Sequence, residues 1–353
     1  MDISVVIVTK NRVELLSRSL NALRHQEFPL SSFEVIVADN GSTDNTQAVC
    51  EEVSAELHEF SYIYDGRPGQ LVGWHRALLD AKGDLLCFID DDVIPSPTWL
   101  ISIAESFKDP GVGMATGPIK IANDCRIPDW IDCMRLGETD NEILPVLGLL
   151  NAGPNIREIP HNFAWGSNFS IRKELLMAVG GFHPGAMPTE LIYMFGDAEI
   201  HVGREVGKLG YKCLYHPDAS VEHHIPEERI SLSAIQSKFM TSGFSRSFQT
   251  LRELKEAYPI PQEEDFVEIA NRYFNRLDEG GSKKYKVTSI IPEIIIILKI
   301  VPKPGFCLRN IHKKRTLTLT RNVAAPIDNL EFFDIPSAST DQGEFPVVDN
   351  INN

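Results

Sequence analysis

The sequence predicts an α/β protein with a doubly wound, mostly parallel sheet that helices flank. Over the first 120 residues, apolar strand-like runs alternate with amphipathic helical segments, which is the rhythm of a parallel sheet with crossover helices. The strand-like runs are apolar on both faces, as buried parallel strands are. The chain has 353 residues, of which 43% are hydrophobic, so it can form one large domain or two smaller ones.

The elements of this first part follow in order from periodicity and capping signals. Strands are expected at 3–8, 33–38, 61–64, 84–89 and 113–119, and helices at 12–25, 44–57, 71–81 and 99–107. The segment 122–160 is rich in Pro, Gly and Asn, so it predicts loops and a short helix. Beyond it we expect ordered structure to resume over 164–171, followed by helices at 173–179 and 198–209, strands at 211–215 and 219–222, and helices at 227–258 and 263–277.

Composition restricts the class of protein. The net charge of −15 argues against a nucleic-acid-binding protein. The six cysteines form no CxxC pair, which is typical of a reducing compartment. No charged segment followed by an apolar one precedes the first strand, so no signal peptide is predicted. These features together predict a cytoplasmic protein.

The end of the chain has a different composition. Residues 281–321 carry ten Lys or Arg and one acid, around the apolar run 290–301. That run is shorter than the ~20 residues that span a bilayer, and its basic surroundings suit a segment lying on an anionic membrane surface. Peripheral contact with the inner face of the plasma membrane is therefore predicted, and an ordinary core element with basic flanks is the alternative. The acidic tail 322–353 is predicted to be disordered.

Three consecutive aspartates, Asp90, Asp91 and Asp92, follow the apolar run 85–89. At the carboxyl end of a buried strand, where α/β proteins bind ligands, three unpaired carboxylates would repel one another. Mg²⁺ or Mn²⁺ relieves such repulsion, since these cations take one or two carboxylates together with phosphate oxygens. The triplet therefore predicts a metal site, with a solvated acidic turn as the alternative.

The ends of the first two strands are expected beside this triplet. Asp39 ends the second strand, and its carboxylate could accept a hydrogen bond from the imide N–H of a nucleobase. The first strand ends in Thr9, Asn11 and Arg12, whose backbone amides face the same crevice. A turn followed by a helix cap is the alternative for the segment 39–46.

An ordered set of motifs over residues 1–246 resembles family 2 glycosyltransferases of the nucleotide-diphospho-sugar type. The set comprises 4–12, 39–46, 81–84, the aspartate triplet, 165–169 with Arg172, 180–182, 196–199, and Pro217 with 221–224. The resemblance implies a GT-A fold with a helical C-terminal extension. We therefore expect a glycosyltransferase domain at 1–225, divided into a nucleotide-binding half at 1–120 and an acceptor half at 121–225. A basic, apolar extension at 226–321 and the tail at 322–353 would follow.

The resemblance also implies roles for individual residues. Asp39 resembles the aspartate that contacts the nucleobase, and Asp90 with Asp92 resembles the Asp-X-Asp site that joins Mn²⁺ or Mg²⁺ to the diphosphate. One of the adjacent histidines resembles the histidine that closes this site. The nucleotide-sugar is then expected to contact Thr9, Asn11, Arg12, Asp39, Arg76, Asp90 and Asp91, and the metal Asp90, Asp92 and His223 or His224. In an extended segment adjacent histidines point to opposite faces, which favours one of them, His223.

Asp197 resembles the general base of the family. It follows a glycine and opens a helix, whose N-terminus favours the ionised carboxylate. A base that removes the acceptor proton contributes ~10²–10⁴-fold, and one base opposite the leaving group implies inversion. A simple helix cap is the alternative for Asp197. Glu199, in the first helical turn, is expected to act as a similar stabiliser or to contact the acceptor.

Three other residues each have two possible interpretations. Trp165 is a candidate for stacking on a sugar, or a core tryptophan. Arg76 could reach the diphosphate, or lie on the helix surface. Gly196 stands where the family has Glu, which raises the possibility of an impaired site.

The function predicted from the sequence is inverting, metal-dependent transfer of a sugar to a hydroxyl group. The expected donor is a nucleotide-diphospho-sugar, a UDP-sugar in the first place, and the acceptor a glycan or lipid-linked molecule of cell-surface polysaccharide synthesis. The alternatives are a sugar-nucleotide-binding protein with an impaired site and a sugar nucleotidyltransferase, whose Gly-rich basic loop is lacking after the first strand. No GxGxxG follows a strand, which excludes a dinucleotide dehydrogenase.

Overall fold

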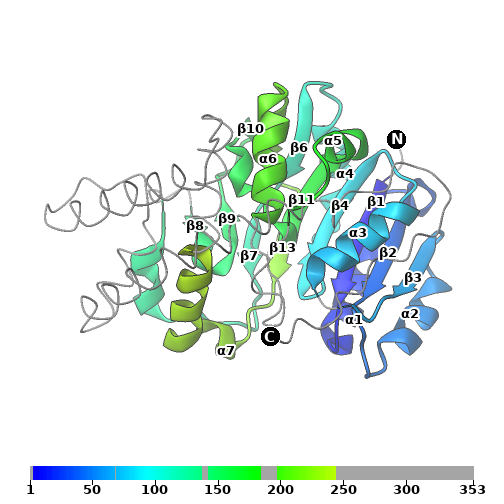
Figure 1. Ribbon diagram of the computed structural model, residues 1–353, viewed down its shortest axis with the longest axis horizontal. Coiled ribbons are helices and arrows are strands. Elements are labelled where there is room, and N and C mark those ends of the chain that lie inside the picture. The colour runs from blue at the N-terminus through cyan, green and yellow to red at the C-terminus, as the bar shows by residue number, and fades with distance from the viewer. Residues whose placement is uncertain (1–2, 68, 137–141, 184–196, 244–353) are drawn as a thin grey trace, which may run out of the picture.

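The computed structural model describes residues 3–67, 69–136, 142–183 and 197–243, and the statements below concern these parts of the chain. Two sheets organise them (Figure 1). The larger sheet has eight strands in the order β10-β12-β6-β11-β4-β1-β2-β3, and the smaller has five in the order β5-β13-β7-β9-β8. The predicted α/β class is confirmed.

The half of the large sheet nearest the N-terminus is wholly parallel. Its strands are β1 (Ile3–Thr9), β2 (Phe33–Asp39), β3 (Phe60–Tyr64) and β4 (Leu85–Asp90). The chain runs outward from β1 to β3 and then returns to pair β4 with the other side of β1. This reversal of strand order is a topological switch point, where the carboxyl ends of neighbouring strands leave room for a ligand.

The other half of the large sheet mixes directions. It contains β6 (Val112–Thr116), β10 (Arg157–Glu158), β11 (Phe169–Arg172) and β12 (Lys212–Tyr215). Strand β11 is antiparallel to both β4 and β6, and β10 is antiparallel to β12, whereas β12 is parallel to β6. Segments from both predicted halves of the domain therefore share one sheet.

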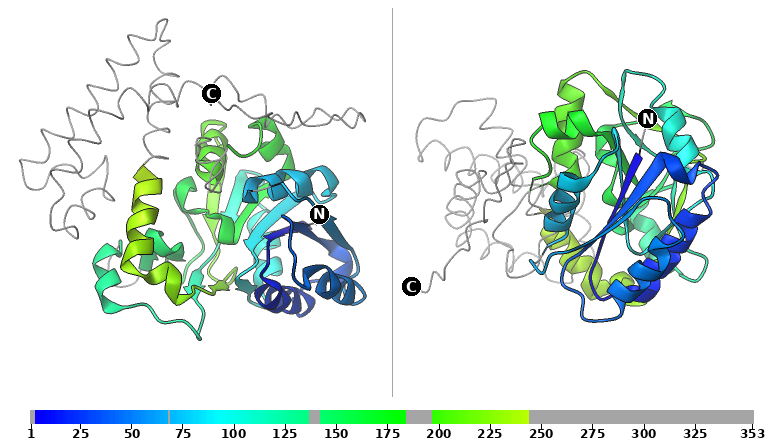
Figure 2. Two further views of the ribbon diagram at one scale, coloured as in Figure 1. Left: turned by 60° about the horizontal axis from the view of Figure 1, so that its bottom comes forward. Right: turned by 90° about the vertical axis from the view of Figure 1, so that its right-hand side faces the viewer.

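Helices cover both faces of this sheet. They are α1 (Val13–Arg24), α2 (Thr46–Ser54), α3 (Gln70–Asp80), α4 (Trp99–Ser106), α5 (Lys173–Ala178) and α6 (Ala198–Lys208). The edge-on view in Figure 2 shows α1 and α2 on one side of the parallel strands and α3 on the other. Gly210, with φ +86°, follows the end of α6 in the left-handed conformation that glycine adopts readily at helix ends.

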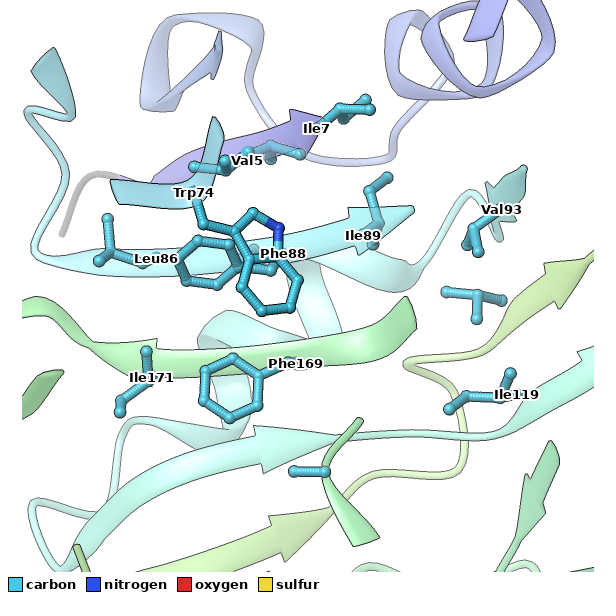
Figure 3. Close-up of a cluster of buried hydrophobic side chains, with 14 of the residues drawn as sticks. Val5, Ile7, Trp74, Leu86, Phe88, Ile89, Val93, Ile119, Phe169 and Ile171 are labelled. Atoms are coloured by element: carbon cyan, nitrogen blue, oxygen red, sulfur yellow. The ribbon is translucent and has the colours of Figure 1, made fainter. Parts of the chain in front are cut away.

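The core lies between these layers. Figure 3 shows Trp74 of α3 against Phe88 of β4 and Phe169 of β11. The centroids of the Trp74 and Phe88 rings are 5.3 Å apart, and those of Phe88 and Phe169 are 5.8 Å apart. These side chains and their aliphatic neighbours are almost fully buried, so the strand ends above them rest on a rigid base.

The smaller sheet shows that the prediction for residues 122–160 was incomplete. Residues 122–160 were predicted to form loops and a short helix, but they also contribute strands to both sheets. The small sheet consists of β5 (Val93–Pro95), β7 (Ile119–Ile121), β8 (Glu142–Leu144), β9 (Leu149–Asn151) and β13 (Val221–His223). Short 3₁₀ turns lie at Leu30–Ser32, Asp129–Met134, Pro145–Leu147, His161–Phe163 and Gly166–Asn168. Strands of three residues have too few alternations to show a period, and tertiary pairing decided their conformation.

The two sheets approach closely at Gly117, between β6 and β7. A Cβ atom at this position would collide with the backbone carbonyl of Ala219, so only glycine permits the contact. This approach places β13 beside β5 and hence beside the end of β4.

The C-terminal part is described as far as residue 243. Helix α7 (Glu227–Ile230) ends before Ser231, and residues 232–243 are again helical, so the predicted continuous helix is interrupted. The remaining expectations for 244–353, the basic apolar stretch and the acidic tail among them, lie outside the described residues. In the part that is described, no helix has the length and apolar character needed to cross a membrane.

Candidate active site

Strand register brings the predicted carboxylates to one edge of the large sheet. Asp90 lies opposite Val8 in the pairing of β4 with β1, and Thr9 lies opposite Asp39 in the pairing of β1 with β2. All these strands are parallel, so their carboxyl ends meet at this edge. The row from Asp39 to Asp90 therefore lies at the switch point of the sheet.

Asp91 holds neighbouring segments together. Its two carboxylate oxygens accept hydrogen bonds from Thr9 Oγ1 and from an Arg12 guanidinium nitrogen, each over 2.7 Å. Its backbone carbonyl accepts a further bond from Ser19 of α1 over 3.1 Å. Burial raises the pKa of Asp91, and the charge of Arg12 partly offsets this effect. With both oxygens engaged, Asp91 positions the turn that carries its two neighbours.

Asp90, Asp92 and His223 converge on one point. One ligand atom from each lies within 4.8 Å of the others, and His223 Nε2 is 3.4 Å from Asp92 Oδ1. The pairing of β13 with β5 explains this geometry, because it sets His223 opposite Val93, the residue after Asp92. Gln70, at the start of α3, donates a 2.6 Å hydrogen bond to Asp90 Oδ1.

The electrostatics of the two aspartates differ. Desolvation, followed by the charge of Asp92, raises the pKa of Asp90 to about 6. Desolvation also opposes the charge on Asp92, but His223, Arg12 and Arg229 outweigh it and hold the pKa of Asp92 below its ordinary value. Arg12 and Arg229 each donate to Asp92 Oδ2, over 3.1 and 3.2 Å. Asp92 is therefore the more readily ionised of the two, and a positive charge bound nearby would favour ionisation of Asp90 as well.

The atoms that face the centre of this cluster are suited to a cation. Within the described chain, Asp92 Oδ1 and both ring nitrogens of His223 are buried and make no hydrogen bond of good geometry. Buried polar atoms without a partner are costly, and a divalent cation would satisfy the carboxylate oxygen and one ring nitrogen at once. Asp90, Asp92 and His223 are therefore the residues that could hold Mn²⁺ or Mg²⁺.

The expected nucleotide side is well ordered. Asp39 is buried, and its two oxygens accept 2.7 Å bonds from the Ser42 amide and the Tyr62 hydroxyl. Asn11 has φ +53° and joins the first two loops by accepting a 2.7 Å bond from the Thr43 amide. Each Asp39 oxygen has a second lone pair, so the carboxylate can accept a further hydrogen bond.

Asp197 and Glu199 occupy different surroundings at the start of α6. Asp197 is the N-cap residue, and its oxygens lie 3.8 Å from His183 Nδ1 and from an Arg204 guanidinium nitrogen. The residue after it, Ala198, has φ +41°, which a non-glycine residue adopts only when its surroundings enforce it.

Glu199 lies in the first turn of α6, beside Gly166. Its Oε1 accepts a 3.3 Å bond from the Gly166 amide. Burial, together with the charges of Asp90 and Asp197, raises the pKa of Glu199 to about 7. Lys238, on the helix 232–243, is exposed as a whole residue, yet desolvation of its ammonium group lowers its pKa to about 8. The charges of Asp90 and Glu199 act on the pKa of Lys238 in the opposite sense.

Other predicted residues lie apart from this cluster. Arg76 forms a 3.2 Å ion pair with Asp80 on its own helix. Trp165 packs partly buried against the core, with its ring 6.0 Å from that of Phe163. His224 turns away from His223, and its side chain contacts Asp124 and Cys125.

Sequence reasoning did not identify four residues at the cluster edge, namely Gln70, Tyr62, Arg229 and Lys238. Gln70 is the first residue of a helix that starts above the sheet, which is a usable signal. Nothing local distinguishes Arg229 or Lys238 from surface residues, because long-range packing alone brings them here.

Residues 4–180, half of the chain, match Glycosyl transferase family 2. The chain belongs to this family. It is 29% identical over 217 residues to glycosyltransferase AglE of Haloferax volcanii, covering 61% of this chain and 64% of AglE. It is 25% identical over 248 residues to succinoglycan biosynthesis protein ExoM of Rhizobium meliloti, covering 69% of this chain and 73% of ExoM.

The chain spans only part of the length of the first relatives that it matches. Besides AglE, the chain matches validoxylamine A glucosyltransferase of Streptomyces hygroscopicus over only 28% of that protein, so it spans less than two thirds of either. Among solved structures, TarS 1–349 of S. aureus in complex with UDP-GlcNAc superposes with a TM-score of 0.50 at 19% identity, covering 95% of this chain and 90% of that one. This likeness confirms the GT-A type of fold.

Proposed function

We propose that this protein transfers a sugar from a nucleotide-diphospho-sugar, with a UDP-sugar as the first candidate, to a hydroxyl group of a glycan or lipid-linked acceptor. The observation that supports it best is the convergence of Asp90, Asp92 and His223 at the switch point of the sheet. A cation held there would neutralise the diphosphate leaving group. The match to ExoM, a succinoglycan biosynthesis protein, supports a role in polysaccharide synthesis.

The chain's own residues supply the rest of the donor site. Arg12 and Arg229 place two guanidinium groups on Asp92, where they also add positive charge for the diphosphate. Asp91 and Thr9 hold the loop rigid, and Asp39 is proposed to contact the base. Donor contacts of Asn11 and Arg76 remain proposals, as does sugar stacking on Trp165.

Two carboxylates are candidates for the base that takes the acceptor proton. Glu199 is favoured, because its charge interacts with Asp90 and its pKa of about 7 suits proton transfer near neutral pH. Asp197, the residue favoured by the sequence motif, is engaged near Arg204 and His183 and is proposed to hold the helix start. With either base, attack opposite the leaving group gives inversion at the anomeric carbon.

A donor panel tests the proposal. Unfolding temperature and sugar transfer would be measured with UDP-, GDP- and dTDP-sugars in Mn²⁺ or Mg²⁺, for wild type and Asp92→Asn. A ligand at 100 times its Kd stabilises the folded state by ~2.7 kcal/mol, so a true donor is readily detected. We expect cation-dependent stabilisation and transfer with one donor class, both lost in the variant. Absence of both with every donor would refute the proposal.

The same panel distinguishes a working glycosyltransferase from a sugar-nucleotide-binding protein with an impaired site. That alternative arose from Gly196, which lies outside the described residues. Donor binding with neither transfer nor slow donor hydrolysis would favour it over a working enzyme.

A further inference from the structure

A second group of metal-ligating side chains lies behind the acidic cluster. It consists of Asp124 and Cys125, in the loop after β7, and His224, directly after β13. Asp124 Oδ1 is 3.2 Å from His224 Nδ1, Cys125 Sγ is 3.4 Å from the same nitrogen, and the two ligand atoms of the loop are 3.6 Å apart.

These three distances match the edges of a tetrahedral metal site. With Zn–S of ~2.3 Å and Zn–N or Zn–O of ~2.0–2.2 Å, tetrahedral angles set such ligand atoms roughly 3.3 to 3.6 Å apart. The Cys125 thiol and the protonated Nδ1 of His224 can each donate to Asp124 Oδ1, but these two bonds leave the 3.4 Å contact between Sγ and Nδ1 without a proton, whereas one cation would bind all three atoms. We propose that Asp124, Cys125 and His224 bind one borderline-soft divalent cation of the Zn²⁺ class, with water in the fourth position.

Neighbouring groups form hydrogen bonds with the proposed ligands, as is usual around metal sites. The other oxygen of Asp124 accepts a 3.0 Å hydrogen bond from Arg18 of α1, which leaves Oδ1 for the cation. Burial and then the charge of Asp124 raise the pKa of the Cys125 thiol, and the Ile225 amide, which donates to Sγ over 3.3 Å, partly offsets them; a bound cation would supply the positive charge that favours the thiolate. Asp124 is exposed and the other two are half-buried, so a cation can enter. On binding, the thiol proton is released to solvent.

The two clusters have different ligand atoms and should therefore bind different cations. Asp90 and Asp92 are hard oxygen ligands suited to Mn²⁺ or Mg²⁺, whereas a thiolate selects softer ions such as Zn²⁺. His223 ends β13 and His224 follows it, and their side chains lie one at each cluster. The His224 amide also donates a 2.8 Å bond to the carbonyl of Asp92, so a cation at this site would clamp the turn that carries the acidic pair.

Cobalt spectroscopy on the full chain tests the proposal without any sugar donor, so its outcome is independent of the glycosyltransferase assignment. Metal-free, reduced protein would be titrated with Co²⁺, and thiolate-to-cobalt charge transfer in the near ultraviolet recorded. We expect a band that saturates at one equivalent and disappears when Zn²⁺ is added. Oxygen-rich coordination at the acidic cluster gives no such band.

Variants locate the site. Cys125→Ser should abolish the band. Cys133→Ser, which removes a neighbouring exposed thiol, should keep it, as should Asp92→Asn. His224→Gln retains the thiol and should weaken Co²⁺ binding at least ~10-fold. Circular dichroism verifies that each variant is folded, and should Cys125→Ser not fold, His224→Gln decides. No band in wild type, a band that survives Cys125→Ser, or unchanged affinity in His224→Gln would overturn the proposal.

Discussion

The identity of the base can be decided from the pH dependence of turnover. If Glu199 takes the acceptor proton, it must be ionised, and its pKa of about 7 makes this ionisation incomplete just below neutral pH. At pH 5 only about one Glu199 in a hundred would be ionised, so kcat should fall roughly tenfold per pH unit below the midpoint. A bound cation near Asp90 stabilises the carboxylate, so the midpoint in the loaded enzyme is expected at or below 7.

The assay measures kcat between pH 5 and 8.5 at saturating donor, acceptor and Mn²⁺. Saturating cation keeps Asp90 ionised, so its own titration does not shape the profile. Glu199→Gln preserves the side-chain shape and should lower kcat by ~10²–10⁴ and remove the acidic limb. Asp197→Asn serves as the matched variant on the same helix and should keep the limb. A Glu199→Gln enzyme with the wild-type profile, or an Asp197→Asn enzyme without the limb, would refute the assignment.

Four further expectations concern the same regions. Asp92→Asn removes one cation ligand, so calorimetry should show Mn²⁺ affinity at least ~10-fold weaker, and equal affinity would contradict the site. Arg229→Gln removes a charged hydrogen-bonding group, whose bonds are worth ~1.5–3 kcal/mol. It should weaken binding of the nucleotide-diphospho-sugar about tenfold, with Mn²⁺ binding retained. Gly117→Ala should lower the free energy of unfolding by ~1–3 kcal/mol in urea denaturation, whereas Gly243→Ala should not, because an added Cβ atom there would enter open space. Because burial raises the pKa of Glu199, the folded state binds its proton more tightly than the unfolded state. Stability should therefore decrease as pH rises from 4.5 to about 7, and this slope should be absent in Glu199→Gln.

The strands and their polar ends could be predicted because their signals are local. The run 85–89 is apolar throughout and ends at Asp90, and this pattern alone predicted the buried strand that the structure shows and a candidate metal site at its tip. The segment 122–160 could not be predicted in the same way. Its strands have two or three residues each, and they pair with partners from other parts of the chain.

The division of roles within the site required the tertiary structure. The sequence placed three aspartates together without separating them, and the contacts show Asp91 bound to Thr9 and Arg12 while its neighbours face the cluster. Alternation along an extended segment indicated that only one of His223 and His224 can reach the acidic pair, and the structure places His223 there.

By itself, the sequence determined the α/β class, the parallel strands of the first half and the aspartates at their carboxyl ends. These features depend on residues close together in the chain, through hydrophobic period and strand termination. Only the tertiary structure decided which groups meet those aspartates. Arg229 reaches Asp92 across 137 residues, and the Gly166 amide binds Glu199 at the start of α6. Such meetings depend on the packing of the two sheets, which no local pattern encodes.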